Sequence, residues 1–513
     1  MKLFTIGDSI SQGFMSGAGA RTDLSFSTLI AEQLKAKNYQ IPIWEKGGQP
    51  LNIEYLLRKL EKRLGNNIKG PIEWPIALSI INNYFDEVED YYEREEGNKP
   101  VSKIPYHNVA VRGFDVSSSW QITPALSEKF IDKSKGKKDN TFGLVDESVL
   151  RTAYTVLANK TEENNSQLDW LNYHHQKEGV ENLILWLGGN NALGTVLNLK
   201  INQTSSNGNA FENGPEKVSF QERRDADWNL WHPEDFRVEY KYMIDKVIDI
   251  MENNPNNTDY KVFIGTIPLV TIIPIIKAVG EGIDREEIKV IDWPIDPTNP
   301  APIGLSDLPK SKERDISYAK YYTYFAFADN FNINDRHLNL QQVLHIDNCI
   351  RKYNRIIQET IAEANERLGL KRFFIVDVAT VLSDMALKRN NYEPTYHFPE
   401  YFNYVYPRVD TKYYGTTRKG EIKSGGIFSL DGVHPTAIGQ GIIAFEFLKT
   451  MKLAGSYLGD PEKDLNWDQI FKSDDLYSKP MAILSELYDN TELIKWFMKI
   501  IELIKPSKNT SGL

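Results

Sequence analysis

The sequence has one cysteine, Cys349, among 513 residues. A single cysteine cannot form a disulfide within the chain, and it cannot supply a metal site that needs several thiolates. Basic residues are not in excess either, because 60 Lys and Arg stand against 70 Asp and Glu, for a net charge of −10. That balance gives no electrostatic reason to expect nucleic acid as a partner.

Long hydrophobic runs are also missing. The longest uncharged apolar stretch covers 262–276, which is shorter than the about 18 residues of a membrane-spanning helix. The first residues, MKLFTIGDSISQGF, turn polar too early for a signal peptide. We therefore predict no transmembrane segment and a cytoplasmic location, with secretion left open if the N-terminus is a processed or engineered one.

Apolar residues make up 41% of the chain and aromatic residues 12%, which is enough for a large buried core. Short apolar runs alternate with stretches of helical periodicity, and this pattern predicts an α/β fold with a parallel sheet. Strands are predicted at 3–6, 107–111, 183–187, 262–265 and 373–376, and helices at 236–251, 346–368 and 436–451.

The connections between these elements are uneven in length. Four stretches are far longer than ordinary α/β loops of about two to six residues, namely 47–105, 196–235, 280–340 and 388–427. We interpret them as insertions in one domain over 1–458. Residues 459–513 are predicted to form a helical extension packed on that domain, since apolar residues between 493 and 504 share one helix face.

The first candidate site residue is Ser9, in the motif GDSIS. The motif directly follows the predicted strand 3–6 and precedes a predicted helix, which places Ser9 where open α/β sheets bind their ligands. The alternative is that the serine only caps the helix.

Three further motifs end apolar runs or occupy tight turns. In DGVHP, Asp431 precedes His434 by three residues and can orient its ring, so that the other ring nitrogen accepts a serine proton. GGNN ends a strand at Asn190, whose amide can donate to an oxyanion, and NVAVRG ends one at Gly113, whose N–H can do the same. The alternative in each case is an ordinary loop or turn.

The four motifs occur in one order and together resemble those of the SGNH hydrolases, the GDSL-type esterases and lipases. The resemblance runs from the first strand to the helix after His434. It implies a three-layer α/β/α sandwich of the flavodoxin-like type, with about five parallel strands. The chain departs from the family at Asn191, where aspartate is common, and in its long insertions.

By this resemblance, Ser9 is the nucleophile, His434 the general base and Asp431 its orienting acid. The oxyanion hole consists of the Ser9 and Gly113 N–H groups and the Asn190 amide. The pair Gly47-Gly48 is a rival for the glycine. No cofactor or metal is implied, and the substrate is a small-molecule, lipid or carbohydrate ester.

Three functions stay open at this point. The first is an esterase or lipase acting on acyl chains, with the run 268–274 lining an acyl pocket. The second is a carbohydrate O-acetyl esterase, with Trp228 and Trp231 as a sugar platform. The third is a catalytically silent binding module. Among the other histidines, we predict His174 and His175 to lie at the surface.

Overall fold

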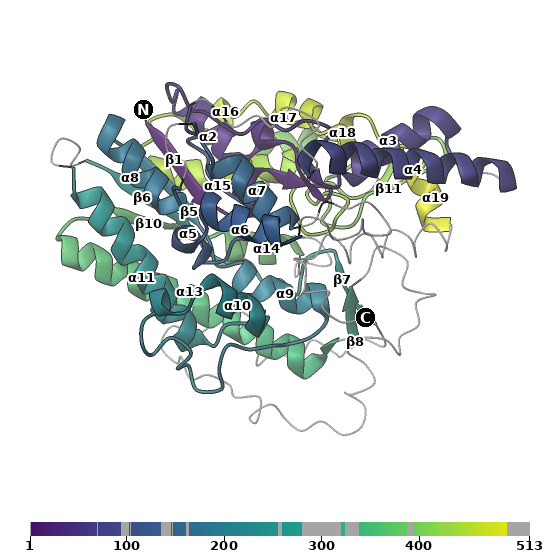
Figure 1. Ribbon diagram of the computed structural model, residues 1–513. Coiled ribbons are helices and arrows are strands. Elements are labelled where there is room, and N and C mark those ends of the chain that lie inside the picture. The colour runs from purple at the N-terminus through teal and green to yellow at the C-terminus, as the bar shows by residue number, and fades with distance from the viewer. Residues whose placement is uncertain are drawn as a thin grey trace, which may run out of the picture.

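The computed structural model of the chain describes residues 2–68, 70–93, 102, 104–134, 145, 147–160, 164–254, 259–279, 320–323, 338–386 and 394–489. At its centre is a four-stranded parallel sheet in the order β1-β5-β6-β10 (Figure 1). Its strands are β1 Leu3–Gly7, β5 Asn182–Trp186, β6 Lys261–Gly265 and β10 Phe373–Val376. The predicted α/β class and four of the five predicted strands are confirmed.

The predicted strand at 107–111 is only partly formed. It lies beside β1 and makes one parallel bridge, between Thr5 and Asn108. The Val109 N–H donates to the Thr5 carbonyl at 3.0 Å. The Ala110 N–H does not pair with another strand but donates to the side-chain oxygen of Asn108 at 3.0 Å. The segment makes two more backbone bonds with β1, from the Thr5 N–H to the His107 carbonyl at 2.8 Å and from the Val111 N–H to the Gly7 carbonyl at 3.1 Å.

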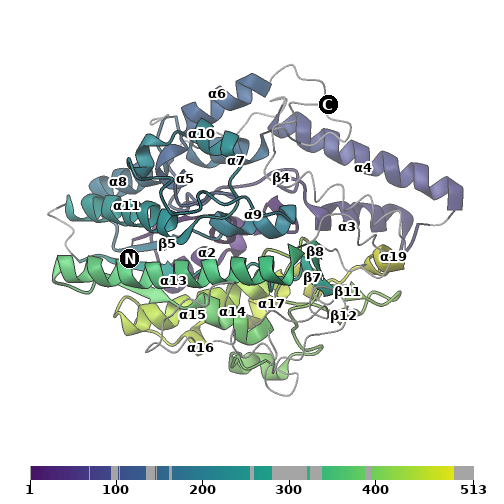
Figure 2. The same ribbon diagram turned by 90° about the horizontal axis from the view of Figure 1, so that it is seen from below.

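Helices pack on both faces of the sheet (Figures 1 and 2). On one face, Phe26 of α2 and Phe447 of α15 contact Trp186 of β5, with ring centroids 5.6 and 5.9 Å from its ring. On the other, Phe4 of β1 contacts His174 of α8 at 5.2 Å. The covering helices are α2 Phe26–Gln33, α15 Ala437–Leu453, α8 Gln167–Glu178, α11 Pro233–Glu252 and α13 Leu340–Leu368. This double cover explains why the strands read as continuous apolar runs.

The predicted helices at 236–251, 346–368 and 436–451 correspond to α11, α13 and α15. Two of them begin as their sequences suggest. Pro233 is the first residue of α11, where its missing N–H costs nothing, and the Thr436 hydroxyl caps α15.

The long insertions carry structure of their own. Helices α3 and α4 form in 47–105, α10 in 196–235, and a hairpin, β11-β12, in 388–427. The insertion 280–340 and the helix predicted over 493–504 lie almost wholly outside the described residues.

Further described helices are α1 Ser9–Gln12, α3 Ile53–Leu64, α4 Gly70–Tyr92, α5 Ser118–Gln121, α6 Pro124–Ser134, α7 Ser148–Leu157, α9 Asn190–Asn198, α10 Phe220–Ala226, α14 Val378–Ala386, α16 Pro461–Asp464, α17 Trp467–Ser473, α18 Asp475–Ser478 and α19 Leu484–Asp489. Smaller antiparallel sheets comprise β2 Phe14–Met15, β3 Ala18–Gly19 and β4 Gln49–Pro50; β7 Ile276–Val279, β8 Lys320–Thr323 and β9 Leu338–Asn339; and β11 Gly415–Thr416 and β12 Ile422–Ser424. In the part of the chain that the structure describes, no helix combines the length and apolarity needed to cross a bilayer.

Candidate active site

A pocket at the carboxyl edge of the parallel sheet brings together Ser9, Asn190 and His434. Ser9 follows β1 and Asn190 follows β5, and these strands pair in parallel, so both residues lie at the same edge. His434 reaches the pocket from the turn that precedes α15. Three residues that the sequence predicts for one site therefore line one pocket.

Ser9 is the first residue of the short helix α1 and is buried. The preceding Asp8 caps this helix, because its carboxylate accepts from the Ile10 N–H at 3.1 Å. A side chain at Gly7 would place its Cβ only 2.6 Å from Cβ of Ser11, so glycine is required for the chain to turn so sharply here. Within the described chain, neither the Ser9 hydroxyl nor its N–H has a hydrogen-bond partner, which leaves both free for a substrate.

The Asp431 carboxylate holds the His434 ring. Its Oδ2 accepts from His434 Nδ1 at 2.9 Å and from the Gly17 N–H at 2.9 Å. Its Oδ1 accepts from the backbone N–H groups of Val433 and His434, both at 2.9 Å. Because Nδ1 donates to the carboxylate, Nε2 of His434 is the nitrogen that can accept a proton.

The surroundings of Asp431 favour the ionised form of its carboxyl group. Burial raises the pKa of this carboxyl, but the neighbouring His434 and the hydrogen bonds from His434 and Val433 outweigh that effect and hold the pKa below its ordinary value. The carboxylate therefore stays ionised and can stabilise an imidazolium.

No hydrogen bond joins Ser9 to His434 in the described structure, although both line the pocket. Such bonds are often long or misaligned in enzymes without substrate and tighten in the complex. The Phe14 ring packs against the His434 ring, with centroids 4.6 Å apart, and limits how far the imidazole can move.

The Asn190 amide is tied to the turn that carries Gly113. Its Nδ2 donates to the Phe114 carbonyl at 2.8 Å and makes a weaker contact of 3.4 Å with Asp8 Oδ2. Gly113 precedes Phe114, has a φ of 76°, and leaves its N–H without a partner in the described chain. Gly113 does not itself line the pocket.

The rival pair Gly47-Gly48 lies elsewhere. Both have a φ of 82°, in the turn before β4, and Gly47 lines a second, polar pocket with Arg21 and Arg58. Neither residue lines the pocket of Ser9.

Asn191, where the resemblance favours aspartate, is fully buried and has a structural contact. Its Oδ1 accepts from the Val116 N–H at 3.2 Å, which holds the turn after Gly113 against α9.

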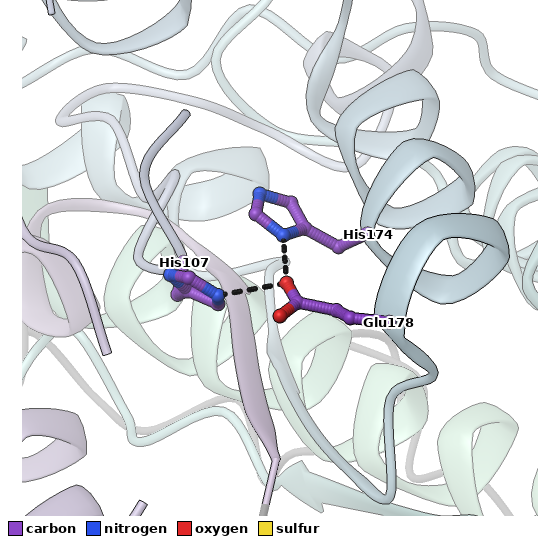
Figure 3. A group of neighbouring side chains, drawn as sticks. All are labelled: His107, His174 and Glu178. Carbon is purple, nitrogen blue, oxygen red and sulfur yellow. Dashed lines mark hydrogen bonds and ion pairs between the residues drawn. The ribbon is translucent and has the colours of Figure 1, made fainter. Parts of the chain in front are cut away.

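One cluster in the described chain has a donor set that suits a metal ion. His107, His174 and Glu178 present ligand atoms within 4.8 Å of one another. Both rings point at the Glu178 carboxylate (Figure 3), with His107 Nε2 at 3.0 Å and His174 Nδ1 at 2.5 Å from Oε1. The two ring contacts hold the pKa of Glu178 well below its usual range, with His107 the larger cause, while burial lowers the pKa of His174.

The hydrogen bonds favour a structural network over a metal site. The Gln40 N–H donates to His107 Nδ1 at 3.0 Å, so the proton of this neutral ring sits on Nε2. For Nε2 to bind a cation while Nδ1 keeps accepting this bond, the ring would have to become an imidazolate, with no proton on either nitrogen. The cluster joins the segment beside β1 to the end of α8.

Two further sequence predictions concern a pair of histidines and a pair of tryptophans. The surface location predicted for His174 and His175 is wrong, since the two are 3% and 0% exposed. The sequence lacks a carboxylate next to them, but Glu178 lies one helical turn after His174 and is reached by it. Trp228 and Trp231 pack against each other at 6.3 Å and do not line the pocket.

Asp8 is a neighbour of the site that the sequence did not single out. It lines the pocket beside Ser9, and burial raises its pKa from 3.8 to about 6, against the lowering effects of the Ile10 N–H and of His434. Its folded-state pKa is raised, so ionisation destabilises the folded protein progressively as the pH rises towards and through 6. The only sign in the sequence is an acidic residue placed at the end of a buried strand.

We predict that Asp8→Asn makes the protein more stable than the wild type at pH 7.5 and changes its stability much less at pH 4. Asparagine can still cap α1, and the variant avoids a burial cost of at most about 3 kcal/mol, the equivalent of the pKa shift. Urea unfolding at both pH values measures the gain. Asp249→Asn, at an exposed position on α11, is the control. Parallel pH profiles for Asp8→Asn and the wild type would contradict the prediction.

Comparisons with protein-family models, with curated proteins and with solved structures give no match to this chain. A function therefore has to be argued from the geometry of the pocket and from the motifs that line it.

Proposed function

We propose that the protein is a serine-dependent carboxylic ester hydrolase of the SGNH type. The observation that carries this proposal is the hydrogen bond from His434 Nδ1 to Asp431, in a pocket that Ser9 also lines. A serine, a histidine and a carboxylate arranged in this way can serve as a nucleophile, its general base and the group that orients the base.

The reaction would proceed through an acyl-enzyme. Ser9 Oγ attacks the ester carbonyl carbon while His434 Nε2 takes its proton, and the carbonyl electrons move to oxygen. The tetrahedral intermediate collapses, the alcohol leaves with the proton from His434, and the acyl group stays on Ser9. Water, deprotonated by His434, then releases the acid by the same steps.

Three donors would stabilise the oxyanion. The N–H groups of Ser9 and Gly113 have no partner in the described chain, and the Asn190 amide keeps a strong bond only to the Phe114 carbonyl. Its contact with Asp8, at 3.4 Å, is weak enough to be exchanged for a substrate oxygen. Such donors act where charge develops and are already in place before the reaction.

The sheet order supports the family resemblance. If the bridged segment at 107–111 is counted as a strand outside β1, the five segments in chain order follow the pattern 2-1-3-4-5. This is the flavodoxin-like order, in which ligands bind at the carboxyl ends of the strands where the order reverses. Ser9 and Asn190 follow the two strands at that reversal, β1 and β5.

The pocket wall favours an acyl chain over a sugar. Helix α14 contributes four apolar residues at helical spacing, and the loop after β6 and helix α15 supply others. The apolar lining includes Ile10, Trp186, Leu193, Pro268, Leu269, Val270, Ile273, Val378, Val381, Leu382, Met385, Ile427, Phe428, Val433, Pro435, Ile442 and Ile443. A carbohydrate O-acetyl esterase is the weaker alternative, because Trp228 and Trp231 pack away from this pocket.

We predict that Ser9→Ala lowers the hydrolysis of 4-nitrophenyl esters at least about a thousandfold. A fluorophosphonate should label the wild type and not this variant. Ser11→Ala is the matched control, since the Ser11 hydroxyl is buried without a partner and does not line the pocket. Equal labelling of Ser9→Ala and the wild type would exclude Ser9 as the nucleophile. A properly folded wild type that resists the reagent would favour a binding module.

Asn190→Ala should lower kcat by about a hundredfold to a thousandfold and leave KM nearly unchanged, because the amide acts on the oxyanion. Steady-state kinetics on one ester measure both constants. Asn198→Ala, at the other end of α9, is the matched control. A rise in KM at constant kcat would show that Asn190 binds the ground state instead.

Ile443→Trp should remove activity on long acyl esters while 4-nitrophenyl acetate is still hydrolysed. Ile443 is half-buried and lies on α15 beyond Gly439, so the larger ring would fill the pocket on the side away from His434. The measurement is kcat/KM for esters from acetate to palmitate. Leu453→Trp, exposed at the end of α15, is the control. An unchanged chain-length profile would place the acyl group elsewhere.

A further inference from the structure

Arg112 is a buried cation that the proposed reaction does not use. It is 5% exposed, and its guanidinium makes one hydrogen bond, from Nη2 to the Ser148 hydroxyl, while Nε has no partner. No carboxylate contacts it within the described chain. Burial lowers the pKa of Arg112 to about 9, which still leaves the group protonated at neutral pH.

Other buried arginines in the structure are paired with an acid. Arg223, which is similarly buried, is bonded to Glu239, and the buried Arg151 lies 3.8 Å from a carboxylate oxygen of Glu93. A buried charge without a partner is costly, so an isolated arginine in this position calls for a compensating group.

Two glutamine side chains, one bonded to the Arg112 backbone and one on the nearby strand β4, have unused amide donors. Gln12 accepts from the Arg112 N–H at 2.9 Å through its Oε1, and its Nε2 has no partner. Gln49 is completely buried, and neither its Nε2 nor its Oε1 is bonded. Buried amide groups are almost always hydrogen-bonded, so the unused donors of both side chains are open to a further partner.

The register of the small sheet β2-β3-β4 brings these groups to one face. Phe14 is opposite Gly19, and Gly19 is opposite Gln49, so the three positions share a side. The Gln12 amide fills the place of a side chain at Gly19, with Nε2 at 2.9 Å from where its Cβ would lie. The Arg112 guanidinium covers Phe14 at 5.4 Å from the ring centroid.

We propose that Arg112, Gln12 and Gln49 form a binding site for a small anionic group. Water could satisfy the amides, but it would not neutralise the guanidinium. The bound anion is a free halide ion or a carboxylate carried by the substrate. Both are negatively charged and accept hydrogen bonds, as a guanidinium and amide N–H groups require.

The position of the site connects it with the pocket. The ring of Phe14 contacts the guanidinium of Arg112 as well as the imidazole of His434. Arg112 also directly precedes Gly113. A bound anion would thus lie about one aromatic ring away from the proposed general base.

Thermal unfolding tests the free-ion source without any assumption about catalysis. Sodium bromide is added in steps to the wild type in a buffer that contains neither halide nor carboxylate, and Tm is followed. We expect a saturating rise of about a few degrees, since a ligand that binds only the folded state stabilises it. Crystals grown in bromide should show an anomalous peak next to the guanidinium.

The variants assign the effect to Arg112. Arg112→Met should abolish the bromide-dependent rise. Arg372→Met is the matched control, because Arg372 also lies over a ring, that of Tyr260 at 4.9 Å, but is paired with Asp259. If Arg112→Met does not fold, the wild-type titration and the bromide peak still decide. A rise that Arg112→Met retains would count against the proposal.

The substrate source, which rests on the proposed hydrolase, is tested with two esters of equal length, 4-nitrophenyl butyrate and the mono-4-nitrophenyl ester of succinate. A preference of at least tenfold in kcat/KM for the succinate ester, lost in Arg112→Met, would assign the anion to the substrate. Bromide binding without this preference would assign a free ion. The absence of both responses would overturn the site. A protein that hydrolyses neither ester would contradict the proposed hydrolase, but the bromide result would still stand.

Discussion

The hydrogen bond from the Gly17 N–H to Asp431 Oδ2 joins parts of the chain that are 414 residues apart. The carboxylate that receives it also holds His434, so the position of the proposed base depends on the turn between β2 and β3. Two more contacts reinforce this junction. The Ser16 N–H donates to the Ser429 hydroxyl at 2.8 Å, and Gln440 donates to the Ile10 carbonyl at 3.0 Å. These buried bonds hold the chain around Ser9 against the chain around His434, so that both residues line one pocket.

The two buried carboxyl groups near the pocket differ in how readily they ionise. Asp8 lines the pocket and Asp431 contacts His434 behind it, yet the pKa values of the two carboxyl groups move in opposite directions. Asp431 is surrounded by four hydrogen-bond donors, whereas Asp8 has the Ile10 N–H and only a weak contact with Asn190. At Asp431, the neighbouring His434 and the larger number of donors outweigh the effect of burial and hold the carboxyl as an anion.

Much of the fold could be predicted from the sequence, because strands covered on both faces leave short apolar runs and helices leave a 3.6-residue period. The central helices and four strands follow directly from these patterns. The segment at 107–111 has the composition of a strand, but the Asn108 side chain bonds to its own backbone, and no periodicity reveals such a bond. His174 shows the same limit, since the His107 ring that packs against it at 4.3 Å lies far away in the sequence.

The candidate site was predictable to the extent that its residues stand in recognisable motifs. Ser9, Asn190 and His434 line one pocket, as their positions after strands and turns suggest. Asp8, Phe14 and Arg112 were not singled out, because their importance comes from packing between distant segments. A clue was present for Arg112, a charged residue at the end of an otherwise apolar run, NVAVRG.

The parallel pairing of β1 with β5 has a consequence for synthesis on the ribosome. Strand β1 emerges early, but its partner strand spans Asn182–Trp186, and the loop that carries His434 comes much later. The nascent chain thus carries β1 without β5 until Trp186 has been made, and it carries the proposed nucleophile without its proposed base for most of translation. Parallel sheets with such distant pairings form slowly and expose their edges meanwhile. The same spacing keeps the proposed nucleophile inert until nearly all of the described chain has been made.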